Sequence, residues 1–484
     1  MSLHDPAMAH LLRRAGFGVS SDEADVWNGH TVETAIDRLL EYEVVPDDVD
    51  DQIGNLGYLG TTTRGPFDPN NRITDARQRW LFRLVHTKRP LQEKMALFWH
   101  NHFATGFGKI AGRIGAPAAS RALAAKPSED PNGVRGQLEL FREHALGSFR
   151  DLLLAISQDP AMVVWLDGDT NVKEKPQENY ARELMELFTM GVDFYTESDV
   201  HEGARVFTGW NLRRRGFGQD NGYAQFFYNP SEHDTGTKSF SFAIYPDGNR
   251  TIPARGAVAG YQDGIDFVSA LVAHPETGPR LARKLYGFFV SELSAPDPVL
   301  VQGMADTYYA TGFNLRAVVG HLLRSPQFHE PANRWARYSW PVEFVPRLIK
   351  EVGWQGFSAI RAMTPLANMG QTLFDPPNVS GWRLGRSWFS TATMLARMNF
   401  SSTLAQNQRF AIQSDSMETA KTPEELLDYF LARLSVAPLD PPVRGALLEY
   451  LRAGGAWTGD SRQLAIKGAG LVHLLGALSE YQFV

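Results

Sequence analysis

Apolar residues recur at helical spacing along most of this 484-residue chain. The spacing appears in residues 74–86, in residues 138–156 and through most of the chain after residue 263. A period near 3.6 residues gives each segment one apolar face, and such faces become buried by packing against one another. The sequence therefore predicts a mainly α fold, a multi-helix globular bundle. A short example is the segment 31–42, whose apolar face consists of Val32, Ala35, Ile36 and Leu39.

One region has a different pattern. Residues 225–228 and 239–244 alternate in polarity and are rich in aromatic residues, and nearby Asp-Gly and Gly-Asn pairs favour tight turns, so we expect a small β-hairpin insertion. Residues 107–135 are rich in Gly, Ala and Pro and predict a mobile crossing segment. The predicted parts are an N-terminal helical half with the candidate site (1–212), the β-rich insertion (213–252), a helical half that completes the core (253–400) and a C-terminal helical subdomain (401–484).

The charge balance and the residue types exclude several classes of protein. Lys and Arg number 48 against 54 Asp and Glu, a net charge of −6, so no overall basic field favours nucleic acid as a partner. The chain has no cysteine, so a metal would need His, Asp or Glu ligands. Polar and acidic residues follow Arg13 and Arg14 where an export signal needs an apolar run, and no window reaches the roughly 18 apolar residues of a membrane span. The sequence predicts a soluble protein that is cytoplasmic as written, without a signal peptide; export with a partner or as a trimmed mature form stays an alternative, and the oligomeric state is open.

The stretch of residues 175–210 concentrates ionisable and aromatic side chains and has the signals of two helices joined by a tight elbow. Gly191 suits the left-handed residue just after a helix over residues 177–190. Thr196 and Asp199 are three residues apart, so each can bond to the other's backbone N–H and start the second helix. The elbow is therefore the first place to look for a site.

Two carboxylates lie on the first helix of the elbow. Glu183 and Glu186 are three residues apart, so they are neighbours on the helix surface and repel each other unless a cation, an arginine or a shared proton lies between them. They are candidate metal ligands or a catalytic acid and base, because like-charge repulsion separates two pKa values. We include Arg182 and Arg205 as candidate catalytic residues, with Arg205 placed to steady an anionic group. The structural alternative is a ladder of salt bridges, since Glu178, Arg182 and Glu186 follow at four-residue steps.

The sequence FWHNHF (98–103) contains a histidine pair that is a candidate for metal binding. His100 and His102 are two residues apart, and at about 100° per residue a continuous helix points them to opposite sides. Both would reach one ion only if the helix unwinds around Asn101. In the structural alternative, one histidine forms a hydrogen bond in the core and the other caps a helix end.

Further residues are candidates for the same site. His233 and Asp234, in a polar part of the insertion, would add an imidazole and a carboxylate to the metal, although such a pair in a loop is usually only solvated. Arg214, in a basic loop of three consecutive arginines, is a candidate for binding an anionic substrate. Burial in the core is the alternative for each tryptophan of the candidate substrate platform, which consists of Trp210, Trp382 and Trp388.

Six segments, taken in order, resemble a large bacterial family that is catalogued as a domain of unknown function. Its genes often neighbour one for an exported protein of the alkaline-phosphatase/sulfatase-like superfamily, which the resemblance implies as a partner. The resemblance spans nearly the whole chain but implies no particular reaction. It places His100, His102, Arg182, Glu183, Glu186, Arg205, Trp210, His233 and Asp234 in the signature segments. Those segments are LLRRAGFG (11–18), FWHNHF (98–103), ENYARELMELFTMGVDFYTESDVHEGARVFTGW (178–210), HDTGTK (233–238), HPETGPRLARKLYGFFV (274–290) and MGQTLFDPPNVSGW (369–382).

Two hypotheses of function follow. The first is a metal-dependent enzyme, most simply a hydrolase, in which His100 and one or both glutamates bind a divalent ion and His102, or His233 with Asp234, completes the coordination. The second is a non-catalytic helical scaffold or maturation partner for the phosphatase/sulfatase-like protein. Phosphate-loop, His-Glu-x-x-His and Gly-x-Ser-x-Gly signatures are absent from the sequence, so the motifs name no substrate.

Overall fold

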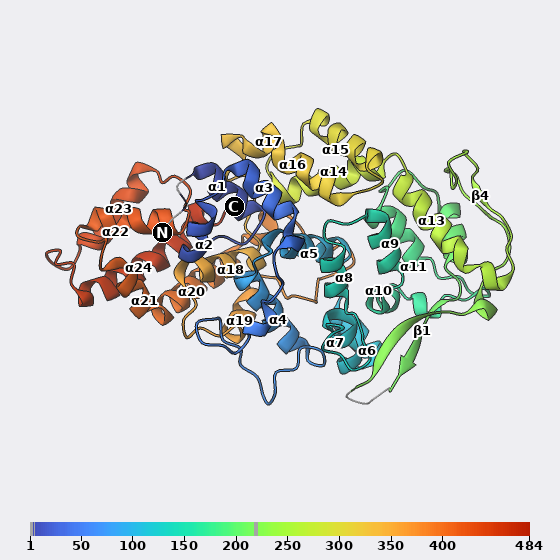
Figure 1. Ribbon diagram of the computed structural model, residues 1–484, viewed down its shortest axis with the longest axis horizontal. Helices are drawn as coiled ribbons and strands as arrows, with labels where there is room; N and C mark the ends of the chain where they lie inside the picture. Colours follow the sequence, from blue (N-terminus) through green and yellow to red (C-terminus); the bar gives the residue numbers. More distant parts are fainter. Residues whose placement is uncertain (1–2, 4, 217–220) are drawn as a thin grey trace.

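The computed structural model describes residue 3, residues 5–216 and residues 221–484. These residues form a mainly α structure with two short antiparallel β-ladders, which confirms the predicted fold class. The molecule is elongated, with the C-terminal helices at one end and the β-strands at the other (Figure 1). No helix in the described ranges combines the length and the apolar character needed to cross a membrane.

The fifth helix, α5, is buried on every side. Each residue from Leu91 to His100 is buried, so this helix has no solvent-facing stripe of the kind that surface helices have. The helices that precede α5 in the sequence are shorter or only partly buried. The first five helices are α1 Pro6–Arg14, α2 Ser21–Trp27, α3 Val32–Leu40, α4 Ile73–His86 and α5 Pro90–His102.

Two charged residues near the start of α5 lie in this interior, and both have partners of opposite charge. The Glu93 carboxylate accepts hydrogen bonds from Arg83 Nε at 2.9 Å and Arg142 Nε at 2.8 Å. The Lys94 ammonium pairs with the carboxylate of Glu343. A buried charge without a partner is strongly unfavourable, so these pairs are what allows a charged helix to occupy the core.

Residues 107–124 form two helices, so the predicted mobile crossing segment is wrong for this part of the range, while residues 125–135 contain neither helix nor strand. Ile110 and Leu123 are fully buried, and their burial together with the high helix propensity of alanine outweighs the glycines. Gly115, at φ 88°, provides the turn between the two helices. The helices of this region are α6 Phe107–Ile114, α7 Ala116–Ala124, α8 Gln137–Glu143, α9 Phe149–Ser157 and α10 Pro160–Trp165.

The two helices of the predicted elbow are present, but the first one changes its winding. Its last five residues form a π-helical turn, in which hydrogen bonds span one residue more than in an α-helix. Gly191 has the expected positive φ, 92°, and Thr196 and Asp199 form the expected capping box. The elements are α11 Asn179–Glu183, the π-helical turn Leu184–Phe188 and α12 Glu197–Val206.

The predicted β-hairpin insertion is present, but its first strand begins earlier and includes the arginine run. Trp210 pairs with Tyr228 and Arg215 pairs with Tyr223, so the three arginines lie in a strand and not in a loop. Residues 217–220 of the predicted insertion lie outside the described residues. The strands are β1 Trp210–Arg215, β2 Tyr223–Tyr228, β3 Lys238–Ser239 and β4 Thr251–Ile252.

The rest of the chain is helical. One of its helices, α18, resembles α5 in being buried along its whole length. Helices α20 to α24 form the end of the molecule opposite to β1 and β2 (Figure 1). The helices are α13 Tyr261–Ala273, α14 Thr277–Phe289, α15 Pro298–Ala310, α16 Leu315–Arg324, α17 Pro326–His329, α18 Pro341–Val352, α19 Ile360–Asn368, α20 Thr391–Asn407, α21 Arg409–Ser416, α22 Pro423–Arg433, α23 Pro441–Arg452 and α24 Ser461–Ala477.

Gly264 of α13 lies directly against the buried indole of Trp210. A Cβ atom at this position would lie 2.2 Å from Trp210 Cζ2. We therefore expect Gly264→Ala to lower the free energy of unfolding by about 1–3 kcal/mol, because the helix and the indole must move apart. Urea denaturation measures this change. Gly112→Ala in α6 is the control: nothing lies within 4 Å of its added Cβ, so it should be neutral or stabilising. Equal stability of the two variants would contradict the packing described here.

Candidate functional site

His100 lies in the core and its Nε2 already has a partner. This nitrogen accepts a hydrogen bond from the Phe374 backbone N–H at 3.1 Å. The rings of Trp80 and Phe374 pack edge-on against the imidazole, at centroid distances of 5.0 and 5.5 Å. Burial lowers the pKa of His100 to about 3, so the ring is neutral. These contacts are those of a structural core histidine, and Nε2 is not free for a metal ion.

His102 has different partners, as its spacing from His100 predicts. Its Nε2 lies 3.2 Å from the carbonyl oxygen of Phe188, and its Nδ1 lies 3.0 Å from Nζ of Lys284. A carbonyl oxygen only accepts, so Nε2 carries the hydrogen and Nδ1 accepts one from Lys284. Burial, followed by the charge of Lys284, lowers the pKa of His102 well below its ordinary value. His102 therefore caps a helix end with one nitrogen and holds a lysine with the other.

Glu183 and Glu186 lie on the elbow helix, where neither forms a hydrogen bond or ion pair with the two histidines of α5. Burial, and then the charge of Glu186, raises the pKa of Glu183. Glu186 accepts a hydrogen bond from the Tyr195 hydroxyl at 2.6 Å. Arg182 donates to both carboxylate oxygens of Glu197, at 2.7 and 2.8 Å. Arg182 thus forms a salt bridge that links the two elbow helices.

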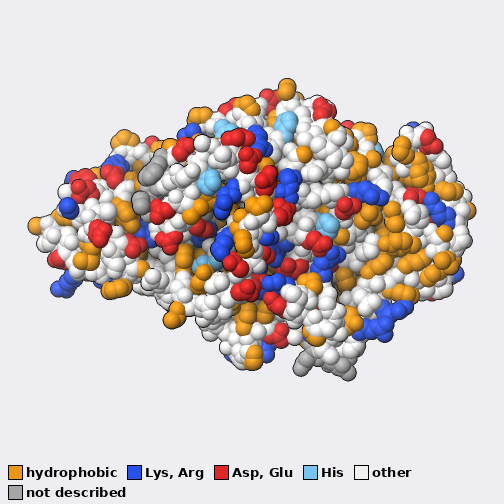
Figure 2. All heavy atoms as spheres, viewed as in Figure 1, with side chains coloured by type: hydrophobic (Ala, Val, Ile, Leu, Met, Phe, Trp, Pro, Cys, Tyr) orange, Lys and Arg blue, Asp and Glu red, His pale blue; other side chains and the backbone are white. Residues whose placement is uncertain are grey.

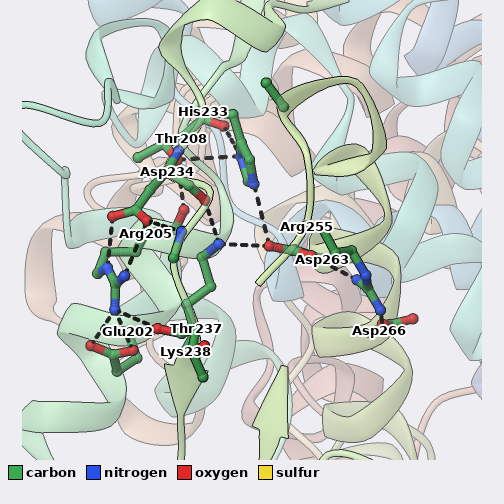
Figure 3. A network of polar contacts seen from close by, with 12 residues as sticks. Glu202, Arg205, Thr208, His233, Asp234, Thr237, Lys238, Arg255, Asp263 and Asp266 are labelled. Atoms are coloured by element: carbon green, nitrogen blue, oxygen red, sulfur yellow. Dashed lines mark hydrogen bonds and ion pairs between the residues drawn. The ribbon is translucent and has the colours of Figure 1, made fainter. Parts of the chain in front are cut away.

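Arg205 directs its guanidinium to the protein itself (Figure 3). It donates to both carboxylate oxygens of Asp234, at 2.8 and 3.0 Å, and to both of Glu202, at 2.9 and 2.7 Å. A further bond reaches the carbonyl oxygen of Thr237 at 3.0 Å. The hydrogen bonds from Arg205 lower the pKa of Asp234 to about 2. Arg205 and Asp234 therefore clamp α12 to the insertion.

His233 lies beside the same clamp, and both of its ring nitrogens face acceptors (Figure 3). Nδ1 is 2.8 Å from the carbonyl oxygen of Thr208, and Nε2 is 3.2 Å from Asp263 Oδ2. Asp263 also accepts from Lys238 Nζ and from Arg255, each at 2.6 Å. Although burial raises the pKa of Asp263, the hydrogen bonds from His233 and Lys238 lower it overall. The polar residues of the insertion therefore satisfy one another.

Two of the three candidate tryptophans are core residues. Trp210 stacks on Tyr261 at a centroid distance of 5.1 Å, and Trp388 packs beside Trp340 at 6.0 Å. Trp210 is 3% exposed and Trp388 is 4% exposed, so neither offers a platform for a substrate. Trp382 is also buried, but it lines a pocket described below.

The predicted metal donors lie in separate environments. They occupy the α5 core, the elbow helix and the insertion, and within the described ranges no three His, Asp or Glu side chains group so that they could hold a metal ion. Arg214 lies on the exposed hairpin, where basic side chains gather (Figure 2), with its Nη2 3.2 Å from Asp169. The geometry gives no support to a single site that combines these residues.

Three side-chain N–H donors, two of them from basic residues, meet at the carbonyl end of the π-helical turn. A helix end has carbonyl groups without partners inside the helix and a partial negative charge, so basic caps are favourable there. This cap brings α5 and α14 together with the elbow helix. The contacts are Arg280 Nη2 to Glu186 O at 2.8 Å, Lys284 Nζ to Leu187 O at 2.9 Å and His102 Nε2 to Phe188 O at 3.2 Å.

A pocket of about 240 Å³ opens beside this cap, and we call it the Lys284 pocket. Leucines and four aromatic rings form most of its walls, and none of the described residues that line it is an Asp or a Glu. Its exposed side carries Ser380, Arg383 and Leu384. The aromatic walls are Phe98, Phe288, Trp340 and Trp382, and the polar groups farther in are Asn101, His102 and Lys284.

Lys284 is mostly buried and has no acidic partner among the described residues. Its ammonium group donates to His102 Nδ1 and to the Leu187 carbonyl oxygen. Burial, and then the positive charge of Arg280, lowers the pKa of Lys284 to about 7. Near neutral pH the group is therefore divided between its ammonium and amine forms, which is the condition for acid and base chemistry.

A larger cavity, of about 640 Å³, lies in the insertion next to α13. Phe242 and Tyr245 line it, and hydrophobic side chains gather over this part of the surface (Figure 2). Its one acidic group, Asp266, is already bound by Arg255 and by the hydroxyl of Tyr245. This cavity has more volume than the Lys284 pocket and also holds a cation, Arg150, whose Nε donates to the Ser269 hydroxyl at 3.0 Å, but unlike the Lys284 pocket it contains a carboxylate.

A family model described as "Protein of unknown function (DUF1800)" matches residues 10–483. The chain belongs to this family. The match confirms the resemblance expected from the sequence, and the family description names no reaction. No curated protein and no solved structure matches the chain.

In this DUF1800 protein, four of the six segments that carry the resemblance meet at one pocket. Segment 98–103 supplies His102 and its neighbours, and segment 178–210 supplies Leu187. Segments 274–290 and 369–382 supply Lys284 and Trp382. Segments far apart in the chain thus contribute the walls and the polar groups of the same cavity.

Sequence reasoning missed Lys284 and Arg383. For Lys284 a signal existed, because a lysine occupies an apolar helical face without a carboxylate three or four residues away. For Arg383 the sequence gives no comparable signal, since its place at the pocket depends on tertiary packing. The apolar helical face that contains Lys284 consists of Leu281, Lys284, Leu285 and Phe288.

Lys284 makes the stability of the fold depend on pH in a defined window. Its pKa is about 7 in the folded protein and about 10.4 in an unfolded chain. Between these values the unfolded chain binds a proton that the folded protein lacks, so stability rises with pH; below pH 7 both states are charged and this slope vanishes. We therefore expect the wild type to gain stability from pH 7 to pH 10 relative to Lys284→Met. Urea denaturation across this range measures the difference, and parallel curves for the two proteins would contradict it.

Proposed function

We propose that the Lys284 pocket binds a small organic anion and that this DUF1800 protein acts on such a compound. The observation that supports the proposal most directly is a contrast between two fully buried lysines and the partly buried Lys284. Lys94 pairs with Glu343, and Lys238 pairs with Asp263 at 2.6 Å. Lys284 has no such counter-charge among the described residues, and it lines a cavity. A bound anion would supply the missing charge.

The rest of the pocket suits a compound with a flat apolar body. Aromatic walls offer rings for stacking and for burial of apolar surface. Arg383 lies at the exposed side, and no described residue forms a hydrogen bond or ion pair with its guanidinium. A planar guanidinium binds a carboxylate through two parallel hydrogen bonds. The pocket thus has two cationic groups, Lys284 inside and Arg383 outside, around an apolar middle.

Helix capping alone accounts for part of this arrangement. Lys284 and His102 satisfy the carbonyl groups of Leu187 and Phe188, as a purely structural cap would. Arg280 caps the carbonyl group of Glu186 in the same way, but it does not line the pocket. Capping does not require a lysine that is buried beside a cavity and has no counter-charge. Arg280 is therefore the matched control that separates a structural role from ligand binding.

The two hypotheses of function drawn from the sequence are separate from this proposal. The metal-dependent hydrolase stays a prediction, and its proposed metal ligands do not meet at one place in the described residues. The role as a scaffold or maturation partner for a phosphatase/sulfatase-like protein also stays a prediction. An organic anion bound at Lys284 requires neither of them.

Benzoate is a suitable probe, because it combines a carboxylate with a flat ring that fits a pocket of about 240 Å³. We expect benzoate to raise the Tm of the wild type, and benzamide, which has the same shape without charge, to bind at least about tenfold more weakly. Calorimetry should show proton uptake on benzoate binding above pH 7, because the bound anion favours the ammonium form of Lys284.

Two variants test which residue is responsible. Lys284→Met should abolish benzoate binding, whereas Arg280→Met should lower the stability but keep the benzoate-dependent rise in Tm. Circular dichroism checks that both variants fold. Equal binding of benzoate by Lys284→Met and by the wild type would refute the proposal, and so would a wild type that binds benzoate and benzamide equally.

A further inference from the structure

The contacts around Lys284 fix the direction in which the lone pair of its neutral amine points. Its Nζ lies 3.0 Å from His102 Nδ1 and 2.9 Å from the Leu187 carbonyl oxygen. The carbonyl oxygen can only accept, and His102 Nδ1 is kept as an acceptor because the Nε2 hydrogen of that ring points to Phe188 O. Both neighbours therefore require a hydrogen from Lys284.

This requirement has a consequence for the neutral amine. A neutral Nζ has two hydrogens, and the two acceptors take both of them. The lone pair then occupies the remaining tetrahedral position, for which the described residues provide no further partner. Since Lys284 lines the pocket, the nucleophilic electron pair is available to a molecule bound there.

The charges around Lys284 favour this neutral form. The titratable and charged groups that face it are His102 on α5, Arg280 on its own helix and Arg383 across the pocket. Two of these are cations, and His102 is a neutral ring. Burial is the larger cause and the charge of Arg280 the smaller one, and together they lower the pKa of Lys284 to about 7. A lysine that loses its proton near neutral pH is a competent nucleophile toward carbonyl carbon.

We infer that Lys284 forms an imine with the carbonyl carbon of a small oxo carboxylate, whose carboxylate binds Arg383. This inference rests on the proposed function and names the substrate class of the same pocket. It explains why one cation lies inside the cavity and the other at its exposed side. The inner one reacts as an amine, and the outer one binds the charged group.

The atoms of this step balance without a further reagent. The lone pair of Nζ attacks the carbonyl carbon, a C–N bond forms, and the C=O π electrons move to the oxygen, which takes up a proton. Nζ gives up one hydrogen as a proton to His102 Nδ1, which already accepts a hydrogen bond from it, and the ring passes this proton to the new oxygen. The hydroxyl group takes up a second proton from the solvent and leaves as water while the C=N bond forms, and the protonated imine then returns its remaining N–H proton to the solvent. An amine and a carbonyl compound thus give an imine and one water molecule.

Phenylpyruvate is the probe for this reaction, with phenyllactate as the matched compound that lacks the carbonyl group. Incubation of the full chain with phenylpyruvate and cyanoborohydride at pH 7 should reduce the imine to a stable amine. Mass spectrometry should then find Lys284 heavier by the mass of the ligand less one oxygen atom. We expect labelling at Lys284 to be at least about tenfold faster than at the exposed Lys109, and to rise with a midpoint near pH 7.

Variants and competition separate the possible results. Phenyllactate should bind to the wild type and suppress the label, Lys284→Met should carry no label on the corresponding peptide, and His102→Phe should label at least about tenfold more slowly. Binding of phenyllactate that depends on Lys284, without any label from phenylpyruvate, would overturn the imine and leave the proposed function in place. Absence of binding by both compounds and by benzoate would overturn both proposals.

Discussion

A helix that is buried on every side must find a partner for each polar group that it carries, and α5 imposes this condition on the rest of the molecule. Arg83 and Arg142 surround its glutamate, and Glu343 meets its lysine. The backbone N–H of Phe374 binds His100, and that of Trp382 binds the side chain of Asn101 at 2.7 Å. Chain segments from most of the sequence are thereby fixed around one helix.

This condition accounts for several contacts between the signature segments without any chemistry. The segment 98–103 ends α5, and the segment 369–382 supplies the backbone groups that bind its polar side chains. Such contacts would be needed in a scaffold as well as in an enzyme. What they do not require is Lys284, whose burial disfavours its charged form and whose Nζ donates hydrogen bonds only to groups without a negative charge. The lysine is thus the feature of this region that packing leaves unexplained.

The sequence predicted those features that depend on neighbours along the chain. Helical periodicity, the positive φ of Gly191 and the capping box at Thr196 are local, and each was visible in a few residues. The π-helical turn was not, because a change of winding over five residues does not alter an apolar pattern enough to be read. The arginine run was assigned to a loop because its charges hid a strand whose partner, β2, holds it in place.

The candidate site was harder to predict, since its contacts join distant parts of the chain. The two-residue spacing correctly placed the histidines of α5 in different environments, and the structural alternative for the pair describes their contacts well. Lys284 lies 182 residues from His102 in the sequence, so no local pattern connects them. Glutamates next to arginines drew attention to the elbow helix, but Arg182 and Arg205 bind carboxylates of the protein itself.

Structural and chemical roles of the cap are linked through the π-helical turn. By ending where it does, the turn presents two successive carbonyl oxygens, from Leu187 and Phe188, to α14 and α5. One oxygen takes a hydrogen from Lys284, and the other fixes the tautomer of His102, which then takes the second. A helix with regular winding would turn these oxygens to other directions. The irregular winding therefore helps to direct these two oxygens toward Lys284 and His102, and the proposed imine depends on that orientation.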